Sequence, residues 1–280
     1  MRLVSLVAVV ALCGALGCGG NTALPMDTKV EPPKPDTKKS GVPTQQAAEP
    51  WGTVTGQITW GGGAVPALPP LAVTADIPHC TSKGPIPDEK WLINKDNKGV
   101  KNVIVWLVDA SNPKTPKAPP IHPSLKDIKD REVVIDQPCC RFEPRVVALR
   151  QGQVLVARNS SPVTHNFNYV GGDDNPGDNS AIAAGKDHRI TDLKASPRAI
   201  TVSCGIHRWM QGWIRVFDHP YFALTDADGK FEFRNAPAGQ YNIVMWHEDG
   251  GWVNGGKTGK PIEIKAGGVT EVSETARPAE

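Results

Sequence analysis

Short apolar or alternating runs of four to eight residues recur along most of the chain, and β-branched residues dominate them. This pattern is typical of strands rather than helices. Clusters of Gly, Pro, Asn, Asp and Ser separate the runs, as in loops between strands. Many short strands with little helix predict an all-β fold built of β-sandwiches. We expect strands at 53–60, 102–108, 132–135, 145–149, 153–157, 199–204, 212–216, 230–234, 241–246 and 260–264.

Two Asp- or Gly-rich segments fall between these strands. The segment 226–229 (DADG) has the composition of a calcium loop, but placing Gly229 at the invariant glycine puts Leu224 at the first ligand position. We therefore interpret it as a hairpin turn. The segment 171–179 is expected to be a solvated loop.

The first 17 residues have the features of an export signal. Arg2 precedes an apolar run from Leu3 to Leu16, which is too short for the roughly 20 residues that span a bilayer. Residues 15–18 (ALGC) resemble a bacterial lipobox, which makes Cys18 the expected lipidation site. Plain secretion and a membrane anchor are the alternatives.

Residues 18–50 are rich in Pro, Lys, Thr and Gln, and predict a disordered, semi-extended tether. A lipid, a tether and a folded body would place the protein in the cell envelope, on the periplasmic side of a membrane, or in the medium if it is simply secreted. The 280-residue chain carries a formal net charge of only +2 and no Lys/Arg stripe, which argues against nucleic acid as a partner.

Four cysteines remain for the folded body, and an oxidising compartment favours pairing them. If residues 139 and 140 lie on a strand they point to opposite faces, and Cys140 shares its face with Phe142. Cys140 is therefore the better partner for Cys80. A second metal site from His79, Cys80, Cys139 and Cys140 is the alternative.

The stretch 204–210 (CGIHRWM) places Cys204, His207 and Met210 three residues apart. Thiolate, imidazole and thioether together select copper, and two His, one Cys and a weak Met form a blue-copper site. His165 is the candidate for the second histidine. The competing interpretation is that these residues merely pack in a core or face solvent.

Residues 153–168 and 203–216 (QVLVARNSSPVTHNFN and SCGIHRWMQGWIRV) are similar to the cupredoxin family, of the amicyanin or plastocyanin type. The resemblance implies a Greek-key sandwich over 132–220 with one type 1 copper ion. Its ligands would be His165, Cys204, His207 and Met210, and Asn166 would clamp the Cys loop. A binuclear copper centre is excluded in its usual form, because residue 200 is Ile.

Residues 52–66, 103–109 and 222–246 look like pieces of a carboxypeptidase-regulatory-type sandwich, of the immunoglobulin or transthyretin class. If they belong together, this flanking sandwich comprises 51–131 plus 221–280, and the cupredoxin is inserted in it or packed beside it. The arrangement resembles methylamine-utilisation-type proteins.

These resemblances imply a monomeric single-electron carrier that meets redox protein partners through a weak interface. The electron would leave through the edge of His207, flanked by Arg208 and Trp209. Copper storage or delivery without redox chemistry, and a structural module with a vestigial site, are the alternatives. An enzyme is not expected, because four protein ligands leave no open position for a substrate.

Overall fold

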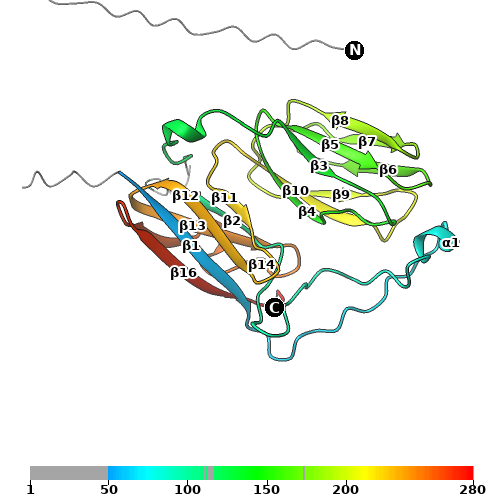
Figure 1. Cartoon of the computed structure of the whole chain (residues 1–280), viewed down its shortest axis with the longest axis horizontal. Coiled ribbons are helices and arrows are strands. Elements are labelled where there is room, and N and C mark those ends of the chain that lie inside the picture. Colours follow the sequence, from blue (N-terminus) through cyan, green and yellow to red (C-terminus); the bar gives the residue numbers. More distant parts are fainter. Residues whose placement is uncertain (1–49, 110, 112–116, 173, 280) are drawn as a thin grey trace, which may run out of the picture. The chain divides into compact units, whose positions relative to one another are not determined.

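The computed structural model describes residues 50–109, 111, 117–172 and 174–279, which are almost entirely β-structure (Figure 1). The expected signal peptide, Cys18 and nearly all of the tether lie outside the described residues. In the described part, no helix has the length and apolar character needed to cross a membrane. The elements are β1 (Trp51–Trp60), α1 (Ile77–Cys80), β2 (Ile104–Val108), η1 (Pro123–Leu125), β3 (Glu132–Ile135), β4 (Val146–Arg150), β5 (Val154–Asn159), β6 (His165–Tyr169), β7 (Asp178–Ile182), β8 (Lys186–Ile190), β9 (Ile200–Ser203), β10 (Gln211–Phe217), β11 (Phe222–Leu224), β12 (Lys230–Pro237), β13 (Gly239–His247), β14 (Gly251–Trp252), η2 (Gly256–Thr258), β15 (Lys260–Ile264) and β16 (Val269–Ala276).

Strands β3 to β10 form one sandwich, which we call the site-bearing sandwich. Its sheets have the orders β4-β10-β9-β6-β7 and β3-β5-β8. Apolar side chains from both sheets meet in one core, for example Leu155 and Ala157 of β5 with Phe167 of β6 and Val202 of β9. This is a β-sandwich, the fold class that the sequence predicted.

The remaining strands form a second β-domain, the flanking sandwich. One sheet has the order β12-β1-β16, and the other has β11-β2-β13-β14 with β15 paired to β13. Its core joins β1 and β12 to β2 and β13 through Val54, Ile58, Phe231, Leu107 and Ile243, all buried. The chain therefore enters the flanking sandwich, builds the site-bearing sandwich, and returns.

Two local expectations differ from the structure. The turn at 226–229 is not a hairpin, because β11 pairs with β2 while β12 pairs with β1 in the opposite sheet. Its backbone closes locally, with Gly229 N donating to the Asp226 carbonyl at 3.0 Å, and the chain then crosses between sheets.

The second expectation concerns the long connection between β1 and β2. The expected boundary at residue 131 assigned this whole connection to the flanking sandwich. Leu71, Val73, Cys80 and Ile86 from this connection pack into the core of the site-bearing sandwich. Figure 1 shows α1 on this connection. The apolar side chains of this segment and its disulfide therefore determine where it packs, and the neighbouring strands β1 and β2 do not.

Candidate metal centre

The four expected ligands lie where three neighbouring strands end. His165 begins β6, Cys204 directly follows β9, and Met210 directly precedes β10. Strand β9 pairs with both neighbours, since Ser203 is opposite Asn168 of β6 and Gln211 of β10. Sheet pairing thus brings together residues that lie 39 positions apart in the chain.

The site formed by His165, Cys204 and His207 is compact and buried. One ligand atom of each lies within 4.8 Å of the others, and all three residues are buried. The Cys204 Sγ is 3.7 Å from the Nδ1 of His207. Met210 is also buried and belongs to the same core cluster, so a thioether adjoins this part of the core.

His165 is the residue whose surroundings fit a metal ligand most clearly. Both of its ring nitrogens are buried and have no hydrogen-bond partner among the described residues. Burial, reinforced by the neighbouring His207, lowers the pKa of His165 from 6.5 to about 4. A buried imidazole that is neutral and unpartnered is costly unless something binds it, and a metal ion binds imidazole in the neutral form.

Backbone N–H groups surround the thiol of Cys204. The amide nitrogens of Asn166 and His207 donate to Sγ at 3.3 and 3.4 Å. Donors at these positions stabilise a thiolate. Nitrogen and sulfur donors, together with a thioether, are the set that suits copper, and the residues present fit a copper ion.

The loop from Cys204 to Met210 is held in place by Asn166. The Oδ1 of Asn166 accepts a hydrogen bond from Gly205 N at 2.8 Å, and its Nδ2 donates to Asn179 Oδ1 at 2.5 Å. Within the loop, Met210 N donates to the His207 carbonyl at 2.8 Å. These contacts connect the loop to β6 and β7, and the role of Asn166 toward a bound metal stays a prediction.

The turn that precedes His165 is ordered by two buried polar side chains. The Nδ2 of Asn159 donates to the carbonyls of Val163 and Ile182, both at 2.8 Å, while its Oδ1 accepts from the Ser161 hydroxyl at 2.7 Å. A buried Asn that bonds the backbone on both sides fixes the path of the turn. It therefore fixes where β6 begins and where the His165 ring lies.

The sequence reasoning missed Asp76, which contacts the other side of His207. The Nε2 of His207 lies 2.9 Å from Asp76 Oδ2. Asp76 caps α1 with φ +45°, a left-handed conformation that is uncommon for a residue other than glycine. No motif signals this contact, since the two residues are 131 positions apart.

The expected electron exit is wrong for His207. Its side chain has no exposed surface, because Asp76 covers the imidazole edge that was expected to face solvent. Trp209 is half-buried, and its indole nitrogen donates to the Cys140 carbonyl at 3.0 Å. On this loop the exposed positions are instead Gly205, Ile206 and Arg208.

A disulfide joins Cys80 to Cys140, the pair that the sequence favoured. The two residues come together in a different way from the one expected, because Cys140 lies in a turn with φ +53° rather than on a strand. The alternative metal site at His79, Cys80, Cys139 and Cys140 does not form, since two of its sulfurs are bonded to each other and Cys139 stays free. Ligand atoms of Cys80, Cys140 and His207 lie within 4.8 Å of one another, so the disulfide adjoins the ring that Asp76 contacts.

No protein-family model matches the chain, and neither does any curated protein. Among solved structures, the chain is similar to a copper(I) form of an amicyanin variant, with 17% identity over 32% of this chain and 87% of that one, at a TM-score of 0.28. A reduced amicyanin variant gives 18% identity, the same shares and a TM-score of 0.29. The copper-containing nitrite reductase of Thermus scotoductus SA-01 gives 21% identity over 35% of this chain and 25% of that one, at a TM-score of 0.29.

Proposed function

We propose that the protein is an exported type 1 copper protein that carries single electrons. The observation that supports this most directly is the buried group of His165, Cys204 and His207, in which His165 has two unpartnered ring nitrogens. These three residues, with Met210 as the weak fourth ligand, would hold one copper ion. When bound, the ion supplies the chemistry by passing between Cu(II) and Cu(I).

The chain's own contribution is a rigid and buried cage. Asn166 and the backbone hydrogen bonds of the loop fix the Cys204 sulfur, while Asp76 accepts the Nε2–H of His207 and leaves Nδ1 directed at that sulfur. A carboxylate behind a ligating imidazole fixes its tautomer and its orientation. Ligands that are held this firmly change little when the charge of the site changes.

The same burial favours electron transfer over copper storage or delivery. Exchange of an ion needs a ligand that solvent or a partner can reach, whereas Cys204 and the two histidines are all buried. Redox partners would meet the exposed Ile206 and Arg208 through a small and transient contact. The Cys80–Cys140 disulfide supports an oxidising compartment, in line with a lipid anchor at Cys18 in the cell envelope.

Copper titration of the metal-free protein tests this function. We expect one equivalent of Cu(II) to produce an intense visible thiolate-to-copper band and a reversible one-electron couple. Cys204→Ser should abolish the band, while Cys139→Ser, which removes the other free thiol among residues 50–279, should keep it. A colourless Cu(II) complex in the wild type would overturn the proposal. Tight Cu(I) binding without an accessible couple would support storage or delivery instead.

A further inference from the structure

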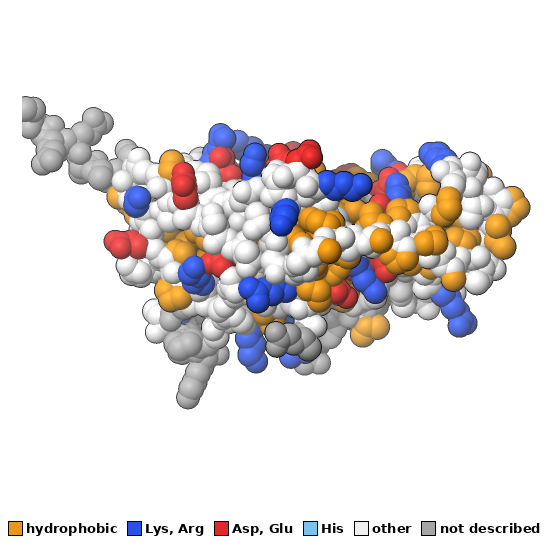
Figure 2. Space-filling view, turned by 90° about the horizontal axis from the view of Figure 1, so that it is seen from below, with side chains coloured by type: hydrophobic (Ala, Val, Ile, Leu, Met, Phe, Trp, Pro, Cys, Tyr) orange, Lys and Arg blue, Asp and Glu red, His pale blue; other side chains and the backbone are white. Residues whose placement is uncertain are grey.

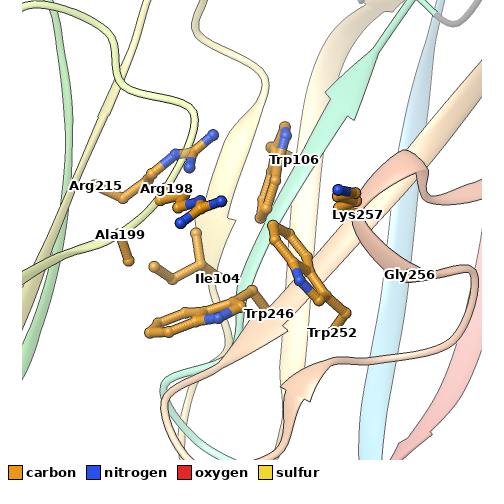
Figure 3. Close-up of a pocket in the computed structure, with 9 residues that line it drawn as sticks. All are labelled: Ile104, Trp106, Arg198, Ala199, Arg215, Trp246, Trp252, Gly256 and Lys257. Carbon is orange, nitrogen blue, oxygen red and sulfur yellow. The ribbon is translucent and has the colours of Figure 1, made fainter. Parts of the chain in front are cut away.

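A cavity of about 620 Å³ lies between the flanking and site-bearing sandwiches, away from the metal centre (Figure 3). It adjoins Ala199, which precedes β9, whereas Cys204 follows β9, so the four strand residues between them keep the two roughly 17 Å apart. Most of its wall consists of two kinds of side chain. These are three tryptophans and three cations: Trp106, Trp246, Trp252, Arg198, Arg215 and Lys257.

The cations of this cavity are not neutralised by the protein. Within the described residues, none of Arg198, Arg215 and Lys257 forms an ion pair, and no Asp or Glu lines the cavity. An adjoining groove, which shares all three cations, adds Lys117 and one carboxylate, Asp218. The positive charge of the cavity therefore exceeds the negative charge near it.

Arg215 is the residue that most clearly points to a ligand. It is only 7% exposed, and its Nε is buried without a hydrogen-bond partner among the described residues. Its guanidinium carbon lies 4.7 Å from the ring centre of Trp106 and 5.0 Å from that of Phe217. Burial lowers the pKa of Arg215 to about 10, which leaves the side chain charged at neutral pH. A buried guanidinium without an acceptor is costly unless an anion supplies one.

The tryptophans provide flat apolar walls on the other sides. The rings of Trp106 and Trp252 meet edge to face at 6.0 Å, and Trp252 is 36% exposed although it is large and apolar. Figure 3 shows the two arginine side chains directed toward these rings from the site-bearing sandwich, with Lys257 on the far side of Trp252. In Figure 2, hydrophobic side chains gather on the visible face with Lys and Arg side chains beside them.

We propose that this cavity binds a small aromatic anion, that is, a flat ring that carries a carboxylate, sulfonate or phosphate group. The ring would stack against the tryptophans, and the anionic group would accept hydrogen bonds from Arg198 and Arg215, while Lys257 adds positive charge at the opposite wall. Guanidinium groups match carboxylate, sulfonate and phosphate oxygens in pairs, and aromatic walls favour stacked rings. Binding at this cavity does not require bound copper, so this proposal can be tested independently of the proposed electron transfer.

Calorimetric titration of the metal-free chain with naphthalene-2-sulfonate tests the site. We expect one ligand per chain, bound about tenfold or more tightly than naphthalene-2-sulfonamide, which lacks the charge, or methanesulfonate, which lacks the ring. Lys257→Ala and Trp252→Ala should each weaken binding about fivefold to tenfold. Both residues are exposed, so these variants should fold normally. Lys186→Ala removes an equal charge from exposed β8, away from the cavity, and should leave the affinity unchanged.

Three results would overturn the proposal. The first is that naphthalene-2-sulfonate shows no saturable binding, and the second is that the uncharged sulfonamide binds equally well. The third is that Lys186→Ala weakens binding as much as Lys257→Ala, which would mean that net charge and not the cavity attracts the anion.

Discussion

Asp76 places a carboxylate beside His207, one of the proposed copper ligands. The Asp76 side chain is 43% exposed, while the His207 side chain that it contacts is fully buried. A negative charge at this place stabilises the more highly charged Cu(II) state of the proposed site. It also occupies the imidazole edge that would otherwise face a redox partner.

Asp76→Asn should therefore raise the reduction potential of the copper-loaded protein. The uncharged amide cannot stabilise Cu(II) to the same extent, and loss of such a partner weakens metal binding by about 10- to 100-fold. Voltammetry and competitive Cu(II) titration measure both effects. Asp127→Asn, at an exposed position, is the matched control and should change neither. An unchanged potential in Asp76→Asn would mean that the contact does not tune the site.

His247 provides a separate prediction about acid stability. Its ring stacks on Trp91 with centroids 3.8 Å apart, and burial lowers its pKa from 6.5 to about 4, against the opposing effect of Asp249. Between pH 6.5 and pH 4, His247 is therefore mostly protonated in the unfolded chain but mostly neutral in the folded chain. Folding stability falls as the pH is lowered through this window, by about 3 kcal/mol at most from this residue.

Denaturant unfolding of the wild type and of His247→Gln at pH 7 and pH 4.5 measures this effect. The variant should lose less stability on acidification than the wild type, whatever its stability at pH 7. Between pH 7 and pH 8 the two should respond nearly alike, because His247 is neutral in the folded chain and mostly neutral in the unfolded chain there. Equal losses on acidification would show that other groups determine the acid response.

At the scale of elements, the strands that the sequence predicted are those with apolar runs. The expected strands 132–135 and 260–264 have the observed bounds, and β5, β9 and β10 differ by one or two residues at each end. The pattern missed β6, β7, β8, β11, β14 and β16. Strands β11 and β14 have only three and two residues, and the other four have polar side chains at some of their less exposed positions. In β16 the buried side chains include Thr270 and Glu274, and Glu274 is paired with Lys260 at 2.5 Å. Because Glu274 is charged, it interrupts the alternation of apolar and polar residues by which a strand is recognised in a sequence. Lys260, which pairs with this buried charge, comes close to it only in the folded chain.

The same distinction applies to the site. The spacing of residue types in the sequence singled out His165, Cys204 and His207, and the pairing of β9 with β6 and β10 brings them within 4.8 Å of one another. Asp76 could not be predicted, because its position depends on a 43-residue connection between β1 and β2 that contains only one turn of helix. No local pattern determines where such a connection packs. The Cys80–Cys140 disulfide and a few apolar side chains determine it.

This role of the disulfide can be tested by replacing Cys80 and Cys140 together with serine. The bond closes a loop across 60 positions, so its loss should lower the free energy of unfolding by about 2–4 kcal/mol. It should also free α1 to move away from His207. The copper-loaded variant should then show the raised potential expected for Asp76→Asn.

Cys139→Ser is the control, since it removes a neighbouring thiol that forms no disulfide. It should change stability by less than about 0.5 kcal/mol and leave the potential unchanged. If the double-serine variant kept the wild-type potential while Asp76→Asn did not, the packing of Leu71, Val73 and Ile86 would suffice to place Asp76.

At the scale of the whole folded body, one buried ion pair links the two sandwiches. Arg145 precedes β4, and its guanidinium donates to both carboxylate oxygens of Glu248 at 2.6 and 2.7 Å. The side chains are only 10% and 3% exposed, and Trp213 donates to the same carboxylate at 3.0 Å. Around this pair a small apolar cluster joins β2 and β13 to β4 and β10.

Glu248→Gln should destabilise the protein strongly, because it leaves the Arg145 charge buried without a counter-charge. Breaking one side of a buried pair costs about 3–5 kcal/mol, whereas Arg145→Met combined with Glu248→Gln should cost less than the single changes predict by addition. Asp187→Asn, in the exposed pair with Arg158, should cost about 1 kcal/mol or less.

Denaturant unfolding can be followed by tryptophan fluorescence and, separately, by the visible copper band. Together the two signals measure the loss of stability and show whether it extends to both sandwiches. If the two sandwiches fold as one unit, both signals should shift together in Glu248→Gln. A shift in fluorescence alone would show that the site-bearing sandwich is stable without the pair.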